Sequence, residues 1–585
     1  MSSPVSQGPD TKNLMFAILA ATAIMFSWQY FYERPRMAAL QAQQKMEMAK
    51  KAVDAPAAPK AAVADSALDA TDGAPRIRIT TPSLHGSISL VGARFDDLTL
   101  AQYHEQRDKT SPEVKMFTRA SAADAYFIEL GMLANDGVAM PNAATRWQSS
   151  DSELTVEKPI TLTWNNGAGL TFTRKISVDE HFMFTITDSV KNNGSAAVKL
   201  YPYGLVSRNY ADISKHTIMM HEGPLGVMNE VLQDVAYKTL RDDGPQKFEA
   251  TKGWLGIADQ YWLAAVIPES SAVFDAQYKQ FKRGDIDAYQ ADMRGLPMDV
   301  PVGQDATHTV RVFAGAKVMK HLDAYRLRYN IPLFDRAVDF GTLYFIARPI
   351  FSLLSFFQGL VGNFGVAILL LTCVIKGLLF PLASKSMTAM ARMKQLTPKM
   401  TEIRERYKDD KMKMNQEVMA MYKREKVNPA AGCLPILLQI PVFFALYRVL
   451  FVTIEMRHAP FFGWIQDLSA IDPTNIFTLF GLIPWNTPSF LHLCVWPIVM
   501  CITMVIQQRL NPKPADPIQA AMMNYMPYIF LFMFASFPAG LVIYWAWNNV
   551  LTILQQLYIN SRLEKKGLME KKETKADKKE GKKGK

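Results

Sequence analysis

Cysteine is scarce in this chain of 585 residues, and its placement excludes one class of protein. The 4 cysteines are Cys373, Cys433, Cys494 and Cys501, and all lie in or beside long apolar runs. Residues 33 to 345 contain none, so this part cannot be a disulfide-stapled scaffold, even in an oxidising compartment. We interpret the four cysteines as small apolar residues packed within a membrane.

Acidic residues are scarce in the second half. Residues 33 to 345 hold 35 Lys and Arg against 38 Asp and Glu, whereas residues 346 to 585 hold 29 against 15. The basic excess lies in a few blocks between apolar runs. A hydrophobic share of 49% also excludes an intrinsically disordered chain. The partition predicts an ordinary soluble domain followed by a membrane domain with basic loops.

Catalytic motifs are missing as well. We find no Walker-type phosphate loop and no nucleophile motif. The histidines of the soluble part, namely His85, His104, His181, His216 and His221, lack metal-ligand spacing. We therefore expect no enzyme activity, no metal site and no cofactor.

Apolar runs long enough to approach a membrane span are present. A spanning helix needs about 20 mostly apolar residues. Six runs qualify, three of them short: residues 14–32, 364–383, 434–454, 490–506, 522–537 and 541–558. We interpret the first as a retained anchor rather than a cleaved signal peptide, because it ends in an aromatic belt and no small-residue cleavage site follows.

The loop charges predict the orientation. Residues 385–430 carry 12 Lys and Arg and residues 562–585 carry 11, whereas residues 456–489 carry only Arg457. By the positive-inside rule, both termini are cytoplasmic and the large soluble domain is periplasmic.

The predicted fold is a polytopic α-helical membrane protein with six transmembrane helices, five of them forming the core, plus a large periplasmic antiparallel β-sandwich domain and a cytoplasmic helical hairpin. The predicted segments are a cytoplasmic N-terminus 1–13, an anchor 14–32, a flexible tether 33–76, the sandwich 77–335, an interfacial amphipathic helix 340–361, a five-helix core 362–560 and a basic cytoplasmic tail 561–585. Within the core, the hairpin is 385–430, the periplasmic loop 456–489 and a second cytoplasmic loop 508–521.

The sandwich is predicted from alternation and turns. Ile160–Trp164 alternates apolar and polar residues, and Asn165–Gly167 and Asn192–Gly194 supply hairpin turns. Sugar binding is one use of such sandwiches, but fold alone does not establish it, so we expect a structural or partner-docking role.

Lys376 is the most informative residue. It stands nine positions before Lys385, so helical rise places it about 13 Å inside the cytoplasmic edge of the membrane. A cation there costs roughly 3 kcal/mol or more without water or a partner. Either its stem reaches the headgroups, or it faces a water-filled cavity open to the cytoplasm.

Other polar residues favour the cavity. Thr372 lies one turn from Lys376, Gln439 lies in the third run, and Asn548 and Asn549 lie in the last. Each alone is commonly an interhelical hydrogen-bonding residue. Because no carboxylate lies deep in a run, a proton relay is absent. Arg448, close to the outer edge, is expected to reach outward to the headgroups.

The cytoplasmic loop is rich in methionine. Its two predicted helices carry a set that we expect to capture apolar client segments: Met387, Met390, Met393, Met400, Met412 and Met419. Plain packing between the two helices is the alternative. The basic tail is expected to be solvated or attracted to lipid, with ribosomal RNA as the other option.

Three separated motifs closely resemble the YidC membrane protein insertase family (YidC/Oxa/Alb), in its Gram-negative type with a large periplasmic domain. They are Ile375–Leu382 (IKGLLFPL), Lys426–Tyr447 (KVNPAAGCLPILLQIPVFFALY) and Phe537–Tyr544 (FPAGLVIY), and the resemblance covers essentially the whole chain.

The resemblance implies an insertase and chaperone for newly made proteins of the bacterial inner membrane, acting alone or with the Sec translocon (SecYEG and SecDF). Implied partners are nascent inner-membrane proteins, the translating ribosome, the signal recognition particle receptor and membrane lipid. Thr372, Gln439, Tyr544 and Trp545 match positions that line the family's groove, which opens to the cytoplasm and to lipid. The family usually has Arg where this chain has Lys376, which keeps the charge but not the bidentate geometry.

Two rivals remain open from the residues alone. A channel or small-solute transporter could use a basic mid-membrane residue as an anion site. An assembly scaffold would instead depend on residues 80 to 320, and its function would survive Lys376→Ala.

Overall fold

Two units make up the described part of the chain. The computed structural model describes residues 73–135, 137–210, 221–270, 272–408, 410–425, 434–483, 493–510 and 517–565. The first unit extends to Ala316 and also includes Lys320–Ala337, and the second contains Lys317–Met319 and the residues from Val338 onward. The predicted anchor, nearly all of the tether and most of the basic tail lie outside the described residues.

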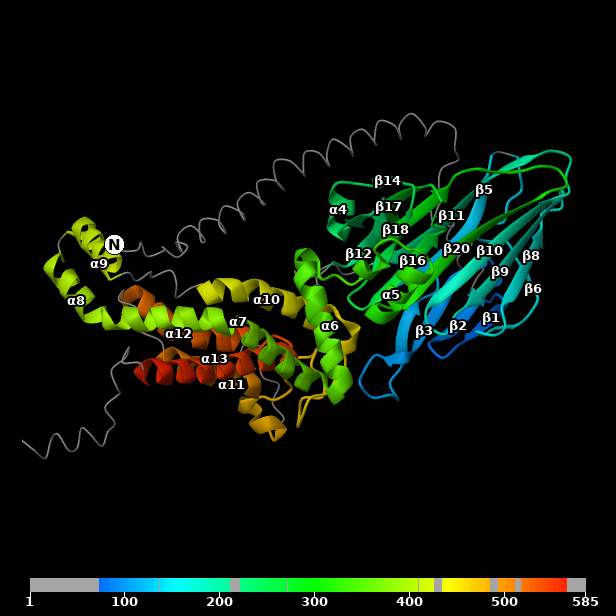
Figure 1. Ribbon diagram of the computed structural model, residues 1–585. Helices are drawn as coiled ribbons and strands as arrows, with labels where there is room; N and C mark the ends of the chain where they lie inside the picture. Colours follow the sequence, from blue (N-terminus) through cyan, green and yellow to red (C-terminus); the bar gives the residue numbers. More distant parts are fainter. Residues whose placement is uncertain are drawn as a thin grey trace, which may run out of the picture. The chain divides into compact units, whose positions relative to one another are not determined.

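The first unit is built from two β-sheets (Figure 1). Among the described residues, the larger sheet contains β1 (Arg76–Thr80), β2 (Leu84–Ser89), β3 (Phe95–His104), β4 (Glu113–Phe117), β5 (Tyr126–Ala134), β7 (Glu153–Leu154), β11 (Val198–Asn209), β14 (Gln246–Ala250), β17 (Phe274–Arg283), β18 (Ile286–Gly295) and β19 (Met298–Val300). The other sheet contains β6 (Gln148–Ser149), β8 (Ile160–Asn165), β9 (Leu170–Val178), β10 (Met183–Asn192), β12 (Gly223–Met228), β13 (Val231–Asp234), β15 (Gly253–Ala258), β16 (Trp262–Pro268) and β20 (Asp305–Ala316). The described part of the unit also contains α4 (Tyr237–Asp242), α5 (Met319–Arg328) and the short 3-10 helix η3 (Phe334–Ala337). α5 starts at the unit boundary.

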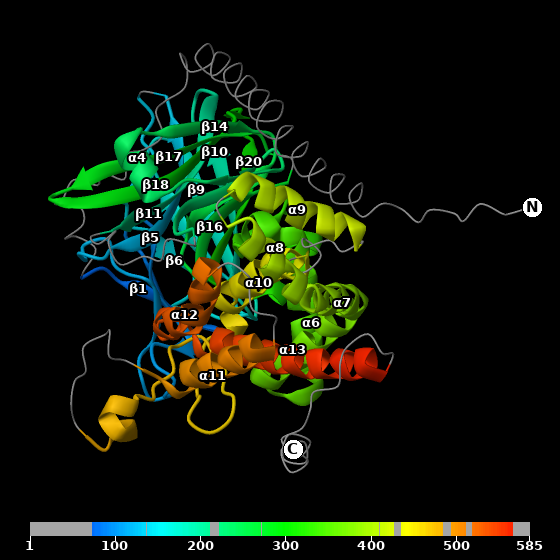
Figure 2. The same cartoon turned by 90° about the vertical axis from the view of Figure 1, so that its left-hand side faces the viewer.

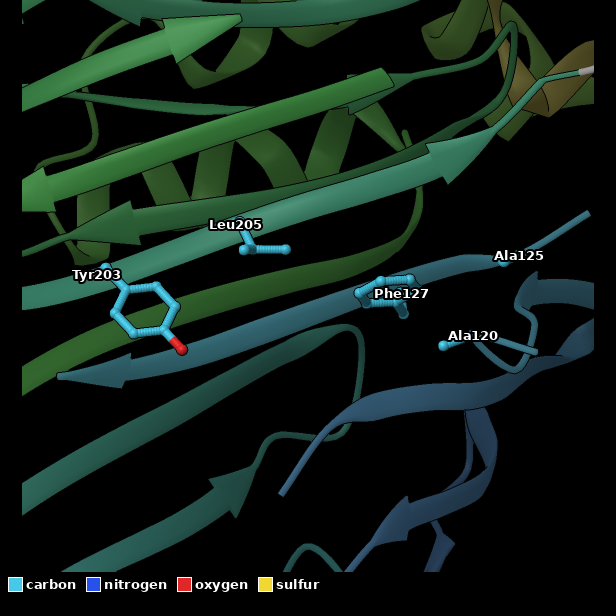
Figure 3. Close-up of a cluster of buried hydrophobic side chains, with 5 residues drawn as sticks. All are labelled: Ala120, Ala125, Phe127, Tyr203 and Leu205. Atoms are coloured by element: carbon cyan, nitrogen blue, oxygen red, sulfur yellow. The ribbon is translucent and has the colours of Figure 1, made fainter. Parts of the chain in front are cut away.

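The two sheets pack face to face, because each presents an apolar side. In β9, alternate residues from Leu170 to Val178 are buried, as the period of two requires. Phe127 of β5 and Leu205 of β11 lie on neighbouring strands and form a buried cluster with Ala120, Ala125 and Tyr203 (Figure 3). The prediction of a β-sandwich domain followed by a helical region is confirmed, although β1 and β7 pair in parallel.

The two predicted hairpin turns have different outcomes. Asn165–Gly167 does join antiparallel neighbours, β8 and β9, and Gly167 has a φ of 72°. The prediction at Asn192–Gly194 is wrong, because this turn leads from β10 in one sheet to β11 in the other. The Asn192 amide is buried and donates to the carbonyls of Ala196 (2.9 Å) and Val300 (2.8 Å), so the motif stabilises a crossover.

The second unit is helical. It contains η4 (Gly341–Leu343), α6 (Tyr344–Val361), α7 (Phe364–Gln395), α8 (Thr397–Arg406), α9 (Lys411–Arg424), α10 (Leu434–Val452), η6 (Ile454–Met456), η7 (Ile476–Gly481), α11 (Val495–Leu510), α12 (Pro517–Phe534) and α13 (Ala539–Lys565). α13 packs against α7 and α11, and α11 and α13 run side by side in both views (Figure 2). α6 packs against α7 and α10.

By length and composition, two described helical segments are long and apolar enough to cross a membrane. They are Gly341–Val361 and Phe364–Met390. Shorter apolar segments follow at Gln439–Val452, Val495–Leu510 and Ala521–Phe534. The first of these five segments is the one predicted to lie along the interface, and the count of six spans stays a prediction.

Candidate functional site

Lys376 lies midway along α7 and faces two other helices. Its ammonium Nζ donates to Thr552 Oγ1 of α13 at 2.9 Å and to Gln439 Oε1 of α10 at 3.4 Å. Both acceptors are neutral, and among the described residues no carboxylate forms an ion pair with this lysine. The side chain is half-buried. A cation in this setting retains a strong attraction for any negative group that reaches it.

Gln439 connects the lysine to a row of polar groups on α13. Its Nε2 donates to Asn548 Oδ1 at 2.8 Å and to the Tyr544 hydroxyl at 3.4 Å. Tyr544, Asn548 and Thr552 follow one another at intervals of four residues, so they share one helical face. We call these five residues, Lys376, Gln439, Tyr544, Asn548 and Thr552, the Lys376 cluster.

Thr552 is the member that sequence reasoning missed. Its hydroxyl donates to the Asn548 carbonyl at 2.7 Å and so presents a lone pair to the lysine. A threonine in an apolar helix carries little signal by itself. Its spacing of four from Asn548 was the available clue.

Three predicted site residues lie outside the cluster's hydrogen-bond network. Thr372 is 1% exposed and donates to the Ile368 carbonyl of its own helix at 2.6 Å. Asn549 is buried and donates to Thr503 Oγ1 of α11 at 3.1 Å, on another side of α13. Trp545 packs edge-on to Phe443, with ring centroids 4.8 Å apart.

The helices that carry the cluster also expose apolar side chains. Val374 and Leu378 of α7 and Ile440 and Phe444 of α10 are exposed, Leu378 by 75%. Helices that carry both a cation and exposed apolar side chains suit a segment that is partly polar and partly apolar.

The methionines of the predicted hairpin differ in their surroundings. Met412 and Met419 of α9 are 76% and 52% exposed. Met387 instead packs against Ile559 and Leu563 of α13, and the Tyr422 hydroxyl lies 3.1 Å from Met400 Sδ. Met390 and Met393 are half-buried residues of α7.

Arg448 has a partner. A guanidinium reaching outward to the headgroups was expected, but Arg448 Nη1 lies 2.9 Å from Asp339 Oδ2, which precedes α6. The pair joins the segment that leads into α6 to α10. The sequence alone does not reveal this pair, because Asp339 lies more than 100 positions earlier in the chain.

Backbone contacts position the start of α13. The amide of Ala539 donates to the Ala470 carbonyl at 2.8 Å, and that of Gly540 donates to the Leu468 carbonyl at 2.9 Å. The loop before α11 thus satisfies amides that a helix start leaves unpaired. Among the described residues no group of three or more His, Cys, Asp or Glu side chains could hold a metal ion.

Comparison with known proteins supplies the family. A family model described as 60Kd inner membrane protein matches residues 356–566, and one described as YidC periplasmic domain matches residues 76–353. A protein of Rickettsia felis named membrane protein insertase YidC is 47% identical over 557 residues, which cover 94% of this chain and 98% of that protein. The chain belongs to the YidC membrane protein insertase family.

Further relatives of this insertase carry the same name. One from Rickettsia bellii is 47% identical over 550 residues, covering 94% of this chain and 98% of its own length. A solved structure of an active YidC insertase with its first transmembrane domain resolved is 17% identical, with a TM-score of 0.34, and covers 83% of this chain and 92% of that one. Membership places the chain among inner-membrane insertases, which are not enzymes.

Proposed function

We propose that this insertase admits the hydrophilic flank of a newly made inner-membrane protein at the Lys376 cluster, through a groove open to the cytoplasm and to lipid. The observation that carries the proposal is the arrangement of Lys376, whose ammonium is held only by the neutral oxygens of Gln439 and Thr552 in the described part of the chain. Such a cation has electrostatic attraction left for an acidic flank.

The energetic logic needs no nucleotide. The client's apolar segment leaves water for lipid, which contributes about 0.8 kcal/mol per buried methylene group. The opposing cost is carrying the polar flank through hydrocarbon, and a polar cluster midway lowers it. Exposed apolar residues of α7 and α10, such as Leu378 and Ile440, would contact the client's apolar part.

The methionine-rich hairpin would receive the client first. The exposure of Met412 and Met419 supports this role for α9. Met387, Met390, Met393 and Met400 would contribute once the hairpin adapts to a client, because methionine side chains repack readily.

The finer assignments of partners and orientation are also proposals. They are that both termini are cytoplasmic, that the sandwich is periplasmic, and that the insertase works with the Sec translocon (SecYEG and SecDF), the translating ribosome, the signal recognition particle receptor and lipid. The alternation of loops rich and poor in Lys and Arg supports the orientation.

Paired clients test the role of Lys376. In proteoliposomes, Lys376→Met should lower insertion of a client with an acidic flank about tenfold, equivalent to roughly 1.4 kcal/mol. Insertion of the same client with a neutral flank should fall much less, and Lys376→Arg should retain most activity. Lys385→Met, on the same helix but exposed, is the matched control. Equal losses for both clients would contradict an electrostatic role.

A further inference from the structure

The loop between α10 and α11 exposes a dense set of large apolar side chains. We call its residues 460–483 the apolar loop. The exposed fractions of these side chains run from 39% to 83%, and they belong to Phe462, Trp464, Ile471, Phe477, Leu479, Leu482 and Ile483. Single exposed apolar residues are ordinary on a surface in water, whereas a contiguous group of them marks an interaction site.

The exposed surface of the apolar loop carries no charge among the residues whose burial is described. Its sequence contains two charged residues, Asp467 and Asp472. Asp472 is 2% exposed. Asp467 is half-buried, and its Oδ1 accepts bonds from the amide and the hydroxyl of Ser469 at 2.8 Å and 2.7 Å. A loop that faces water normally presents its charged side chains there, so this loop is built for another surrounding.

The polar groups of the apolar loop are used by the ends of the helices. Asp472 Oδ2 accepts from the Trp496 amide in the first turn of α11 at 3.0 Å. The Phe461 carbonyl accepts from Nδ2 of Asn363, the residue before α7, at 3.3 Å. Two more carbonyls of the loop accept the first amides of α13, as described above. The polar side of the loop thus faces the bundle, and its apolar side is left outside.

These contacts place the apolar loop at one end of the helical bundle. The helices α7, α11 and α13 begin there and α10 ends there, whereas α7 runs on to α8 at the opposite end. In both views η7, the short orange helix near the start of α11, lies beside the helices rather than beyond their ends (Figure 1, Figure 2). A loop in this position runs along the membrane surface instead of rising away from it.

Two further observations favour lipid as the surrounding. The helix that follows, α11, exposes Val499, Ile502 and Ile506, so the apolar surface of the loop continues on a helix of an inner-membrane insertase. The backbone of η7 is folded into a 3-10 helix, and Asn475 Oδ1 accepts from the Phe477 amide at its start at 3.0 Å. Backbone groups that enter lipid must be satisfied in this way within the protein.

We propose that the apolar loop is embedded in the membrane leaflet at the end of the bundle opposite α8 and α9, with Phe477, Leu479 and Leu482 among the acyl chains. Trp464 lies at the level of the headgroups, where tryptophan is enriched. The embedded loop fixes the depth at which α11 and α13 begin. In the proposed orientation this is the periplasmic leaflet, but the inference depends neither on that orientation nor on the Lys376 cluster. A protein surface is the other occupant, and the experiments distinguish the two.

Spin labels on the loop test the proposal in proteoliposomes of the purified full chain. In a chain whose native cysteines are replaced, the labelled positions are Leu479→Cys and Leu482→Cys. Leu296→Cys is the matched control, because Leu296 is an apolar residue of the sandwich unit with an exposure of 58%. The relaxation agents are oxygen, which concentrates among acyl chains, and the anionic trioxalatochromate complex, which stays in water.

We expect the chromium complex to reach positions 479 and 482 at least about tenfold less than position 296, because an anion is costly to bring into hydrocarbon. Oxygen should reach positions 479 and 482 better than position 296. Equal access of the complex to all three positions would put the loop in water and overturn the proposal. Exclusion of both agents from the loop would show that a second copy of the chain covers it, which would overturn the proposal as well.

Photolabelling of the unmodified protein gives an answer even if the spin labels disturb the loop. The probe is a phospholipid with a diazirine in the middle of one acyl chain, and mass spectrometry locates its adducts. We expect adducts on residues 477–483 and on the exposed face of α11, with none on residues 296–302 of the sandwich unit. Adducts on α11 without any on residues 477–483 would contradict the proposal.

Discussion

Lys376 could be assigned to a polar site from its position in the sequence. A charge inside an apolar run predicts polar neighbours, and Gln439 and Asn548 do lie in one hydrogen-bonded network with it. Which face of each helix points inward depends on packing, and that is why Asn549, one position from Asn548, turns to Thr503 instead. The residue types of the polar network were predictable, whereas side-chain partners across helices were not.

Thr552 should position the lysine. Thr552→Val keeps the shape of the side chain but removes the acceptor 2.9 Å from Lys376 Nζ. Insertion of acidic-flank clients should therefore fall roughly twofold to tenfold. Thr552→Ser keeps the hydroxyl and should insert these clients nearly as well as the unmodified protein. Thr503→Val is the control, because the Thr503 hydroxyl that it removes accepts a hydrogen bond from Asn549, outside the Lys376 cluster. Insertion assays with the three variants give the comparison, and an equal loss in Thr503→Val would argue for a merely structural effect.

His321 should make the sandwich unit sensitive to pH. Its ring lies tilted against the ring of His181, with centroids 3.8 Å apart, and burial, His181 and Lys320 lower the pKa of His321 to about 4 from its ordinary value of 6.5. The unfolded chain therefore binds a proton that the folded chain resists, and stability falls as pH drops from 6.5 towards 4. His321→Phe, which keeps a ring, should reduce the loss in melting temperature between pH 7 and pH 5 by a few degrees, about 2–4 °C for a half-exposed group in a unit of this size. Identical pH profiles for the two proteins would count against this role of His321.

At the scale of elements, apolar periodicity predicted strands and helices well but not their connections. The turn at Asn192 shows the limit: an Asn-Asn-Gly sequence suits a hairpin, but the outcome depends on which sheet the next strand joins. The first helix of the predicted hairpin likewise has no separate start, because α7 continues unbroken through Ser384 to Gln395. Whether one helix runs on into the next depends on packing with other elements, which the local sequence does not show.

The pair between Asp339 and Arg448 should hold the segment that leads into α6 against α10. A double-mutant cycle with Asp339→Asn and Arg448→Gln should give a coupling of about 0.5–1 kcal/mol, since both side chains are about a quarter exposed. Asp339 Oδ1 accepts a hydrogen bond from the Gly341 amide at 2.9 Å. Asparagine at position 339 keeps an oxygen that can accept this bond. Unfolding in detergent measures the cycle, and strictly additive effects would mean that the pair contributes nothing.

At the scale of the whole molecule, the charge partition of the sequence anticipated two units. The structure separates them near Ala316 and Val338, with Lys317–Met319 assigned to the helical unit and most of α5 to the sandwich. Composition could not predict this interleaving, because it arises from contacts that α5 makes after the chain has left the last strand.

The most direct test of the proposed mechanism asks whether water and clients reach position 376. In a chain whose native cysteines are replaced, Lys376→Cys is exposed to a membrane-impermeant thiol reagent from the cytoplasmic side, with and without an arrested client. We predict labelling of the free insertase and protection by the client. A thiol that reacts only after detergent is added, or one that an engaged client leaves fully reactive, would contradict the mechanism.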